Sequence, residues 1–533
     1  MNSVDLKRRM NTIFIYGPPG SGKTTTGRLL AEALELPFLD LDQEIVSRRG
    51  VPIPQIFVEE GETGFRRLEK EVLRSLLEHP EAVIALGGGA LLDNALRKIT
   101  EAAGPVVCLQ VPFESLVERL EPAAGQRPLL AGGQIGEARG DGLRARLGAL
   151  LERRAAHYAS FPLQLETGDL AAQAVAWEAQ VCLGAFRVSG MGPGYDVRVQ
   201  PGGLDQTGEA LRQRGLRGPL ALVSDENVGG LFARRVLESL YNAEYDARWI
   251  NLPVGEAQKN MATVSRLWEA FLEAGLERGS TVLALGGGVV GDLAGFAAAV
   301  FLRGVKWVAL PTSLLAMVDA SLGGKTGADL PQGKNLVGAF HPPRLVLADP
   351  QVLSTLPVAE LRSGLAEVVK HGVIGDPALF ELCAQGWEVI DARREELVRR
   401  AMAVKIGVIQ SDPFEQGQRA ALNLGHTIGH AVELASGFQL RHGEAVAIGM
   451  VAAARLADRL GLAQVGLVER ITDTLHTLGL PVDIPAGLDR AAILRAISVD
   501  KKRSGGSVRF ALPVRIGEVR VGVEVGDFAW VLD

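Results

Sequence analysis

Two glycine-rich loops, each directly after a short apolar run, constrain the fold of this chain more than any other feature. The first, Gly17 to Thr24, follows the run Thr12 to Tyr16, and the second, Gly286 to Asp292, follows Thr281 to Leu285. Each loop leads into a stretch of helical character, and a helix N-terminus after a strand is where backbone N–H groups gather around phosphate. The pattern predicts two α/β units with two separate active sites.

Length and composition narrow the class of protein. The chain has 533 residues, so two or three domains are expected. Hydrophobic residues make up 47% and charged residues 22%, as in soluble globular proteins, and the net charge of −6 argues against a nucleic-acid partner. The cysteines at 108, 182 and 383 are isolated, which fits a reducing compartment. With no signal-peptide pattern and no apolar run of membrane length, a cytoplasmic protein without a membrane partner is expected.

Alternation of β-rich and helical stretches predicts parallel sheets with helices on both faces. In the first unit we expect strands at Thr12–Tyr16, Phe38–Leu39, Ala82–Leu86, Val106–Gln110 and Leu163–Glu166. In the second unit we expect strands at Tyr195–Val199, Leu220–Ser224, Ala247–Asn251, Thr281–Leu285, Trp307–Leu310 and Leu345–Leu347. After Asp349 helical periodicity dominates.

These patterns divide the chain into four segments. Residues 1–186 form an α/β P-loop unit, 187–194 a glycine-rich linker, 195–349 a second α/β unit and 350–533 a mostly helical unit. We expect the last two to face each other across a cleft, a common place for a ligand site.

The first loop matches the pattern G-x-x-x-x-G-K-[ST] in full. Its backbone N–H groups would cradle phosphates, Lys23 would offset their charge and Thr24 would hold Mg²⁺. The loop indicates a nucleotide but not the acceptor of a phosphoryl group.

Asp40 and Asp42 are candidates for metal and acceptor binding. Standing two residues apart, they would lie on the same side of a strand end, one near Mg²⁺ and one on an acceptor hydroxyl; an exposed turn is the alternative. Arg66, Arg127 and Arg154 offer guanidinium groups suited to carboxylate or phosphate, although each could be a surface cation.

Six motifs in order make residues 10–184 resemble shikimate kinase. They are the P-loop, Phe38-x-Asp40-x-Asp42, Phe65-Arg66-Arg67-Leu68-Glu69, Gly87-Gly88-Gly89-Ala90, Arg127-Pro128-Leu129-Leu130 and Arg153-Arg154-x-x-x-Tyr158. The resemblance implies ATP-dependent phosphorylation of the shikimate 3-hydroxyl. It assigns ATP and Mg²⁺ to Gly17, Gly20, Ser21, Gly22, Lys23, Thr24, Thr25, Asp40 and Arg127, and shikimate to Asp42, Arg66, Gly88, Gly89 and Arg154. Lys23, Asp42 and Arg127 would be catalytic, with Arg127 on a lid spanning 123–136. Another small-metabolite P-loop kinase, such as one for gluconate, is the alternative.

The second loop is not an ordinary dehydrogenase fingerprint. It matches G-x-G-x-x-G, but no acidic residue stands about 20 positions further on to bind a ribose; Asp292 follows at once. His426 and His430 at i, i+4 share a helical face, and the glutamate of H-E-x-x-H is replaced by Thr427. Together with Glu367 and the third histidine of this region, His442, they suggest a catalytic Zn²⁺-type site; two structural histidines are the alternative. Basic residues of the same half suit a substrate with phosphate and carboxylate.

Residues 195–533 resemble 3-dehydroquinate synthase over nearly their whole length. The resemblance rests on Gly288 to Asp292, Arg303-Gly304-Val305, Pro311 to Asp319, Gly323 to Thr326, Gly333 to Phe340, Glu367 to Lys370, Leu422 to His430, His442 to Val446 and Asp500 to Lys502. It implies the metal ligands Glu367, His426 and His442, with Zn²⁺ or Co²⁺ as the ion. It implies NAD contacts at Asp225, Asn227, Glu256, Lys259, Gly288, Val289, Val290, Gly291, Asp292, Thr312, Ser313, Asp319, Lys325, Lys334 and Thr355. It implies substrate contacts at Arg303, Lys325, Asn335, Lys370, Arg419, Asn423 and one of the two lysines Lys501 and Lys502. It implies catalytic roles for Lys325, Lys370, Arg419, Asn423 and His430.

The chemistry of that family explains why both NAD and a metal are implied. The substrate is 3-deoxy-arabino-heptulosonate 7-phosphate, and reversible oxidation of one ring hydroxyl acidifies the neighbouring C–H so that phosphate can leave. The two resemblances together imply a bifunctional enzyme of the shikimate pathway, with small-molecule substrates and a homo-oligomer formed through the synthase half. A metal-dependent polyol dehydrogenase fused to a sugar-acid kinase is one alternative. A P-loop unit that only senses nucleotide is another.

Overall fold

The computed structural model describes residues 12–79, 81–122, 141–503 and 508–532, and it separates the chain into two compact units, 1–186 and 187–533. Within the described ranges, none of the helices combines the length and the hydropathy needed to span a bilayer.

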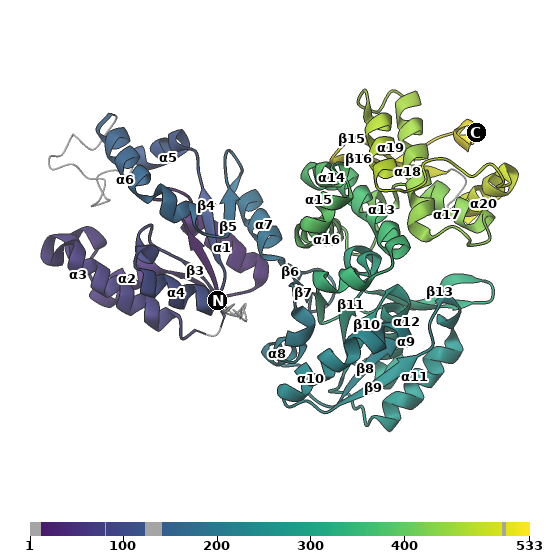
Figure 1. Cartoon of the computed structure of the whole chain (residues 1–533), viewed down its shortest axis with the longest axis horizontal. Helices are drawn as coiled ribbons and strands as arrows, with labels where there is room; N and C mark the ends of the chain where they lie inside the picture. Colours follow the sequence, from purple (N-terminus) through teal and green to yellow (C-terminus); the bar gives the residue numbers. More distant parts are fainter. Residues whose placement is uncertain (1–11, 80, 123–140, 504–507, 533) are drawn as a thin grey trace. The chain divides into compact units, whose positions relative to one another are not determined.

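The first unit is built on a five-stranded parallel sheet of order β2-β3-β1-β4-β5. Figure 1 shows this unit in purple and blue, with β3, β4 and β5 labelled among its helices. Its strands are β1 Thr12–Tyr16, β2 Phe38–Asp40, β3 Ala82–Ala85, β4 Val106–Gln110 and β5 Leu163–Glu166. Its helices are α1 Lys23–Leu34, α2 Leu41–Arg49, α3 Ile53–Leu76, α4 Asn94–Ala103, α5 Phe113–Leu120, α6 Asp141–Ala159 and α7 Ala172–Leu183, with the 3₁₀ turn η1 at Ala90–Leu92.

Alternate residues of these strands enter two separate cores. Phe14 and Tyr16 pack on one face of the sheet, together with residues of α2 and α3, whereas Ile13 and Ile15 pack on the other face against α1 and α7. Because both faces are covered, the strands read as continuous apolar runs, as expected for a parallel sheet. The expected fold of this half is confirmed.

The second unit contains a seven-stranded sheet of order β6-β7-β14-β11-β10-β8-β9. Its strands are β6 Ala185–Val188, β7 Tyr195–Val199, β8 Leu220–Asp225, β9 Ala247–Leu252, β10 Thr281–Gly286, β11 Lys306–Pro311 and β14 Leu345–Ala348. The strands from β7 to β9 are parallel. The segment interpreted as a linker, 187–194, contains the end of β6 and the turn into β7.

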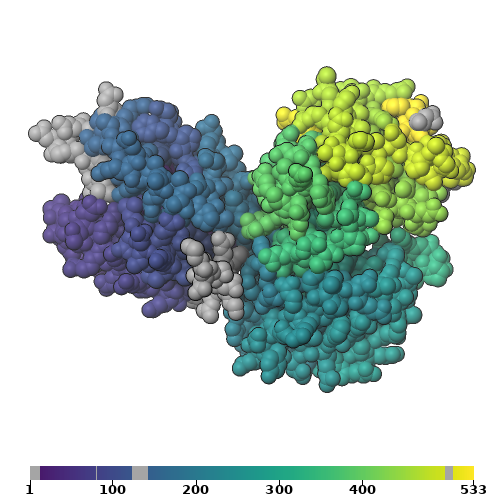
Figure 2. Space-filling view, viewed as in Figure 1, coloured from purple at the N-terminus to yellow at the C-terminus, as the bar shows by residue number. Residues whose placement is uncertain are grey.

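Helices surround this sheet and continue along the chain. Those of the α/β lobe are α8 Thr207–Gln213, α9 Glu226–Val228, α10 Arg234–Asn242, α11 Met261–Glu273 and α12 Gly288–Val300, with short turns η3 Gly203–Gln206, η4 Gly229–Ala233, η5 Glu256–Gln258, η6 Phe301–Arg303, η7 Ala316–Ala320 and η8 Pro350–Thr355. Those of the C-terminal lobe are α13 Val358–Gly375, α14 Pro377–Ala384, α15 Trp387–Ala392, α16 Arg394–Ser411, α17 His426–Ala435, α18 His442–Arg459, α19 Leu467–Thr477 and α20 Arg490–Arg503, with η9 Gln418–Asn423 and η10 Ala529–Leu532. The two lobes meet along one seam, the first in teal and the second in green and yellow (Figure 2).

Two antiparallel hairpins were not expected from the sequence. β12 Lys325–Leu330 pairs with β13 Gly333–Phe340 in the α/β lobe, and β15 Arg509–Arg515 pairs with β16 Glu518–Glu524 in the otherwise helical lobe. The first hairpin carries three of the residues implied as ligand contacts, Lys325, Lys334 and Asn335.

Candidate functional site

The first loop turns tightly between β1 and α1. Gly17 has φ +138°, and a Cβ there would lie 2.8 Å from the carbonyl oxygen of Leu109, so only glycine fits. Helix α1 begins at Lys23, whose Nζ donates to the carbonyl oxygens of Gly17 at 3.1 Å and Pro18 at 2.8 Å. The loop and the helix N-terminus therefore form the phosphate-binding geometry that the pattern predicts.

Asp40 joins the loop to the next helix. Its Oδ2 accepts a 2.7 Å hydrogen bond from the Thr24 hydroxyl, and its Oδ1 accepts from the backbone N–H groups of Asp42 and Gln43. The expectation that Asp40 and Asp42 share one side of a strand end is wrong, because β2 ends at Asp40 and α2 begins at Leu41. Asp40 is the N-cap of α2, and Asp42 lies in its first turn.

The turn Gly87–Gly89 collects the other candidate residues of the first unit. A Cβ on Gly88 would lie 3.2 Å from the Gly17 carbonyl, one on Gly87 3.2 Å from Asp42 Oδ1, and one on Gly89 2.6 Å from the Arg66 guanidinium. The Gly88 carbonyl accepts from Arg154 at 3.0 Å, Tyr158 at 2.7 Å and Tyr16 at 3.3 Å. The structure thus brings the P-loop, an acidic residue and two arginines around one glycine turn.

Glu69 belongs to this cluster, and no role was assigned to it from the sequence. Its side chain is buried and pairs with Arg66 at 2.6 Å. Burial raises the pKa of Glu69, and the Arg66 charge acts against that rise. Glu69 holds the Arg66 guanidinium beside Gly89, and its position three residues after Arg66 on α3 is the signal that could have revealed it. Arg127 and its expected lid lie outside the described residues.

Three adjacent strands of the second unit end at one edge of its sheet. Gly286 ends β10 and pairs with Pro311 of β11, and Leu285 pairs with Ser224 of β8. Because parallel strands share this edge, Asp225, Gly287 and Thr312 lie next to one another there. Helix α12 begins at the same edge, at Gly288. The backbone N–H of Thr312 donates to the Gly286 carbonyl at 3.0 Å, and Ser313 Oγ accepts from Ala316. Val289, Val290, Gly291 and Asp292 form the first turns of α12.

Further residues expected at NAD lie beside this edge. Lys259 Nζ contacts Asp292 at 2.6 Å and donates to Asn335 Oδ1 at 2.6 Å. Lys334 Nζ lies 3.6 Å from Glu256 and 3.3 Å from Glu433 of α17, so the hairpin contacts both lobes. Asp225 caps α9, with Asn227 in that short helix, and Thr355 lies in η8, where its hydroxyl donates to the Val352 carbonyl.

Glu367, His426 and His442 form a compact group of oxygen and nitrogen ligands. Nε2 of His426 and Nε2 of His442 lie 3.5 and 3.4 Å from Oε1 of Glu367, and the candidate ligand atoms lie within 4.8 Å of one another. Glu367 is fully buried on α13, where its Oε1 faces the two imidazoles and its Oε2 pairs with Nζ of Lys370. One carboxylate and two imidazoles suit a divalent transition metal.

Close helix packing brings these residues together. A Cβ on Gly443 would lie 2.0 Å from the Ser363 carbonyl of α13, so α18 approaches α13 more closely than any side chain would allow. His426 and His442 are the first residues of α17 and α18. The outer ring nitrogens have partners too: Nδ1 of His426 lies 3.1 Å from the Leu424 carbonyl, and Nδ1 of His442 lies 3.5 Å from Glu433. Such partners orient the Nε2 atoms inward.

The two histidines differ in their protonation. Burial and the Lys370 charge lower the pKa of His426 to about 3, so its imidazole is neutral. Burial also disfavours charge on His442, but hydrogen bonds and charge from Glu367 and Glu433 outweigh it and raise the pKa of His442 to about 9. Although burial opposes ionisation, Lys370 and the histidines hold the pKa of Glu367 well below its usual range. The group therefore carries an ionised carboxylate ready for a cation.

Buried cations surround the group. Lys370 pairs with Glu367 one helical turn away, and Lys405 of α16 contacts Asp319 Oδ1 at 2.5 Å and its carbonyl at 2.7 Å. Lys405 was not recognised from the sequence, because its helical segment has no motif. Asp319, Glu367 and His371 form a second close trio, but it shares Glu367 with the first, and its additional carboxylate, Asp319, already pairs with Lys405. The Glu367–His426–His442 trio is thus the better metal candidate.

A cavity of about 690 Å³ lies next to the trio. Asn423, His426 and His430 line it together with residues of α20 and of the β15–β16 hairpin. The rings of His426 and His430 are 5.0 Å apart. Arg419 is buried in η9, and its guanidinium donates to the Pro413 carbonyl and would touch a Cβ on Gly323 at 2.6 Å. Lys325 pairs with Glu415, which also lines the cavity.

One predicted substrate contact is not brought to this group, and the side chains of two others are not described. Arg303 is exposed in η6, and the side chains of Lys501 and Lys502, at the end of α20, lie outside the described part of the structure.

Family comparisons agree with these geometries. The family model "3-dehydroquinate synthase N-terminal" matches residues 249–363, and "3-dehydroquinate synthase C-terminal" matches residues 364–503. The 3-dehydroquinate synthase of Synechococcus is 47% identical over 341 residues, covering 62% of this chain and 92% of that protein. The chain belongs to the 3-dehydroquinate synthase family. The enzyme of Xanthomonas campestris is 46% identical over 360 residues, covering 65% of this chain and 96% of its own length.

Solved structures and the N-terminal match complete the comparison. A 2-epi-5-epi-valiolone synthase from Streptomyces hygroscopicus, solved with NAD⁺ and Zn²⁺, is 31% identical with a TM-score of 0.58 and covers 63% of this chain and 94% of its own. The shikimate kinase family model matches residues 19–176. This 3-dehydroquinate synthase therefore carries a shikimate kinase domain, and the chain is a bifunctional enzyme of the shikimate pathway, as the sequence predicted.

Proposed function

We propose that the P-loop cluster transfers the γ-phosphate of ATP to the 3-hydroxyl of shikimate. The observation that carries this is the meeting of Gly17, Asp42 and Arg66 around Gly87–Gly89. Asp42 would orient and deprotonate the acceptor hydroxyl, and Arg66 and Arg154 would hold the substrate carboxylate. Thr24 and Asp40, joined by their hydrogen bond, fit Mg²⁺ with its preference for oxygen ligands. Lys23 and Arg127 would neutralise the phosphates.

We also propose that the synthase unit eliminates phosphate from 3-deoxy-arabino-heptulosonate 7-phosphate and closes the ring to 3-dehydroquinate. The group centred on Glu367 carries this proposal, since a buried carboxylate and two inward Nε2 atoms, all within 4.8 Å of one another, fit Zn²⁺ or Co²⁺. A bound divalent ion supplies polarisation of a substrate oxygen. Lys370, Arg419 and Asn423 would orient the acid beside it, and His430 on the cavity wall could move a proton.

The glycine edge of the second sheet fits NAD. Gly286, Gly287 and Gly288 present no side chains at the N-terminus of α12, and a Cβ on Gly286 would lie only 2.6 Å from Val290. Bound NAD supplies reversible hydride transfer. Asp225 and Thr312 at the same edge, with Lys259 held between Asp292 and Asn335, would contact the dinucleotide. We place the protein in the cytoplasm, as a homo-oligomer formed through the synthase unit.

Two assays on the full-length protein test these assignments. ADP formation should depend on shikimate and be lost in Asp42→Ala while ATP still binds; if Asp42→Ala turned over normally, the acceptor assignment would fail. Phosphate release from the heptulosonate phosphate should require both NAD and Zn²⁺ or Co²⁺ without net NADH. Net NADH from glycerol-like alcohols would instead indicate a polyol dehydrogenase.

A further inference from the structure

A second pocket of the synthase unit lies at the opposite edge of its sheet. Gly194, Lys306 and Arg344 stand at the starts of β7, β11 and β14, and Arg278 precedes β10; together with His341 they line a cavity of about 290 Å³. These four strands are neighbours in the sheet. The catalytic loops follow the carboxyl ends of the strands, roughly 20 Å away along six residues. The pocket is therefore separate from the site described above.

The pocket is cationic and lacks acidic side chains. Arg278, Lys306 and Arg344 line it, and no aspartate or glutamate does. In the described part of the chain, none of these three cations has a carboxylate within ion-pair distance. Asp196, two residues after Gly194, is an acidic residue close to the pocket in the sequence. Its carboxylate already pairs with Arg187 at 3.2 Å and with Arg214 at 2.7 Å. Lys306 and Arg344 are also half-buried, so their charges are less screened than those of surface residues.

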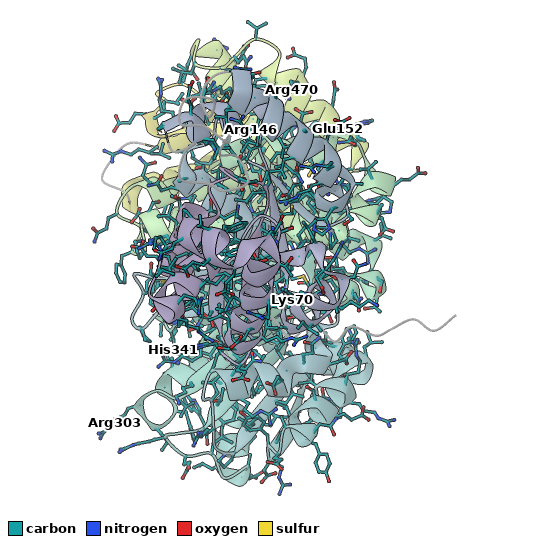
Figure 3. The ribbon with its side chains drawn as sticks, turned by 90° about the vertical axis from the view of Figure 1, so that its left-hand side faces the viewer. Lys70, Arg146, Glu152, Arg303, His341 and Arg470 are labelled. Carbon is teal, nitrogen blue, oxygen red and sulfur yellow. The ribbon has the colours of Figure 1, made fainter. Side chains whose placement is uncertain are left out.

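The walls of the pocket are held firmly. The backbone N–H of Arg344 donates to the Trp307 carbonyl at 2.8 Å, and the His341 carbonyl accepts from the Trp307 indole at 2.8 Å. Nε2 of His341 lies 2.9 Å from the Val305 carbonyl, which can only accept, so this nitrogen carries the proton. The chain before Lys306 is strained, with positive φ at Leu302, Arg303 and Gly304. Figure 3 shows Arg303 projecting from the lobe near this segment.

We propose that this pocket binds a small phosphate-bearing anion. Three cations without a counter-charge favour a dianion, and the Arg344 fork and the Lys306 ammonium suit phosphate oxygens. The volume corresponds to roughly ten waters of about 30 Å³ each, enough for inorganic phosphate or a small phosphate ester. Pro193, Val305 and Pro342 provide apolar walls for the carbon part of an ester.

Calorimetric titration of the full-length protein tests the site. Inorganic phosphate and glycerol 3-phosphate are titrated separately at constant ionic strength into wild type, Arg344→Gln and Lys306→Met. The matched control is Arg248→Gln, an exposed arginine on β9 of the same sheet. Lys23→Met removes phosphate binding at the P-loop instead. We expect Arg344→Gln and Lys306→Met each to weaken phosphate binding at one class of sites by at least roughly tenfold. Arg248→Gln and Lys23→Met should retain wild-type affinity at that same class of sites.

The remaining outcomes are equally decisive. Tighter binding of glycerol 3-phosphate than of phosphate identifies an ester as the ligand, and equal binding identifies the free anion. Kinase activity, which belongs to the other unit, verifies that Arg344→Gln, Lys306→Met and Arg248→Gln are soluble, and a thermal transition of the synthase unit verifies the fold of all four variants. If Lys306→Met fails to fold, Arg344→Gln still decides. Binding by Arg344→Gln indistinguishable from that of Arg248→Gln would overturn the proposal.

Discussion

The Thr24 hydroxyl donates a 2.7 Å hydrogen bond to Oδ2 of Asp40, whose other oxygen caps helix α2. One carboxylate thus serves both the proposed Mg²⁺ site and the start of the helix that carries Asp42. The two roles can be separated, because asparagine retains an oxygen that can cap a helix but loses the negative charge.

We predict that Asp40→Asn lowers kinase turnover by roughly tenfold or more while changing the unfolding free energy of the kinase unit by less than about 0.5 kcal/mol. Asp40→Ala should lose the same activity and also about 1 kcal/mol of stability, since α2 loses its cap. ADP formation at saturating Mg²⁺ and urea denaturation measure the two effects. Full activity in Asp40→Asn would contradict a metal role for this carboxylate.

Metal removal should separate the two activities. After dialysis of the full-length protein against a chelator, Mg²⁺ alone should restore ADP formation with shikimate, because the kinase ligands are oxygens. Phosphate release by the synthase should return only with Zn²⁺ or Co²⁺, because Glu367, His426 and His442 offer two nitrogens. Each assay is the control for the other, and recovery of both activities with Mg²⁺ alone would refute the proposed ligand set.

Metal binding should depend on pH through His442. Its pKa, raised to about 9 by Glu367 and Glu433 against the effect of burial, exceeds the unfolded value of about 6.5. In the metal-free protein this contributes stability below about pH 6.5 that is lost as pH rises through about 9. A metal must displace the Nε2 proton, so apparent Zn²⁺ affinity should rise about tenfold per pH unit between pH 7 and 9. Competition with a chromophoric chelator at three pH values measures this slope; a flat profile would show that His442 does not bind the metal.

Several strands of the two sheets could be predicted closely, because each is a short β-rich run that a loop ends. β1, β4, β5 and β7 have the expected bounds. The β12–β13 hairpin was missed because β13 is largely exposed and lacks apolar alternation. In β16, by contrast, Glu518 to Glu524 alternates at period two, so a readable signal was overlooked.

The site residues, like the strands, include some that a sequence pattern reveals and some that it does not. Motifs identified residues such as Asp42 and His426, because a short sequence pattern around each of them marks its chemistry. Lys405 sits within ordinary helical sequence, and only packing reveals its partner Asp319, whereas the spacing of Glu69 three residues after Arg66 was a readable signal. The Asp40–Asp42 error arose because a two-residue spacing was taken for a strand where α2 had already begun.

The hydrogen bonds that Tyr158 and Tyr16 donate to the Gly88 carbonyl should support shikimate binding, and the shorter bond should contribute more. Tyr158 donates at 2.7 Å and Tyr16 at 3.3 Å, and the Tyr16 hydroxyl also lies 3.0 Å from His157 Nε2. We predict that Tyr16→Phe raises the KM for shikimate by roughly two- to fivefold, as loss of one neutral hydrogen bond implies, and that Tyr158→Phe raises it more. Steady-state kinetics should show the KM for ATP unchanged. An equal rise in both constants would mean that the P-loop itself had shifted.

The buried pair Lys405–Asp319 should be tightly coupled in stability. Lys405→Met leaves Asp319 without the cation that lies 2.5 Å from its carboxylate, and removing one partner of a buried pair costs on the order of 3 kcal/mol. Asp319→Asn should cost as much or more, because it leaves the ammonium of Lys405, which is more deeply buried than Asp319, unpaired. The double variant Lys405→Met/Asp319→Asn should recover most of the loss, since no uncompensated charge remains. Thermal or urea unfolding of the synthase unit gives the four values of this cycle, with kinase activity as the internal control for protein quality. Additive losses in the double variant would show that the two residues stabilise the lobes independently.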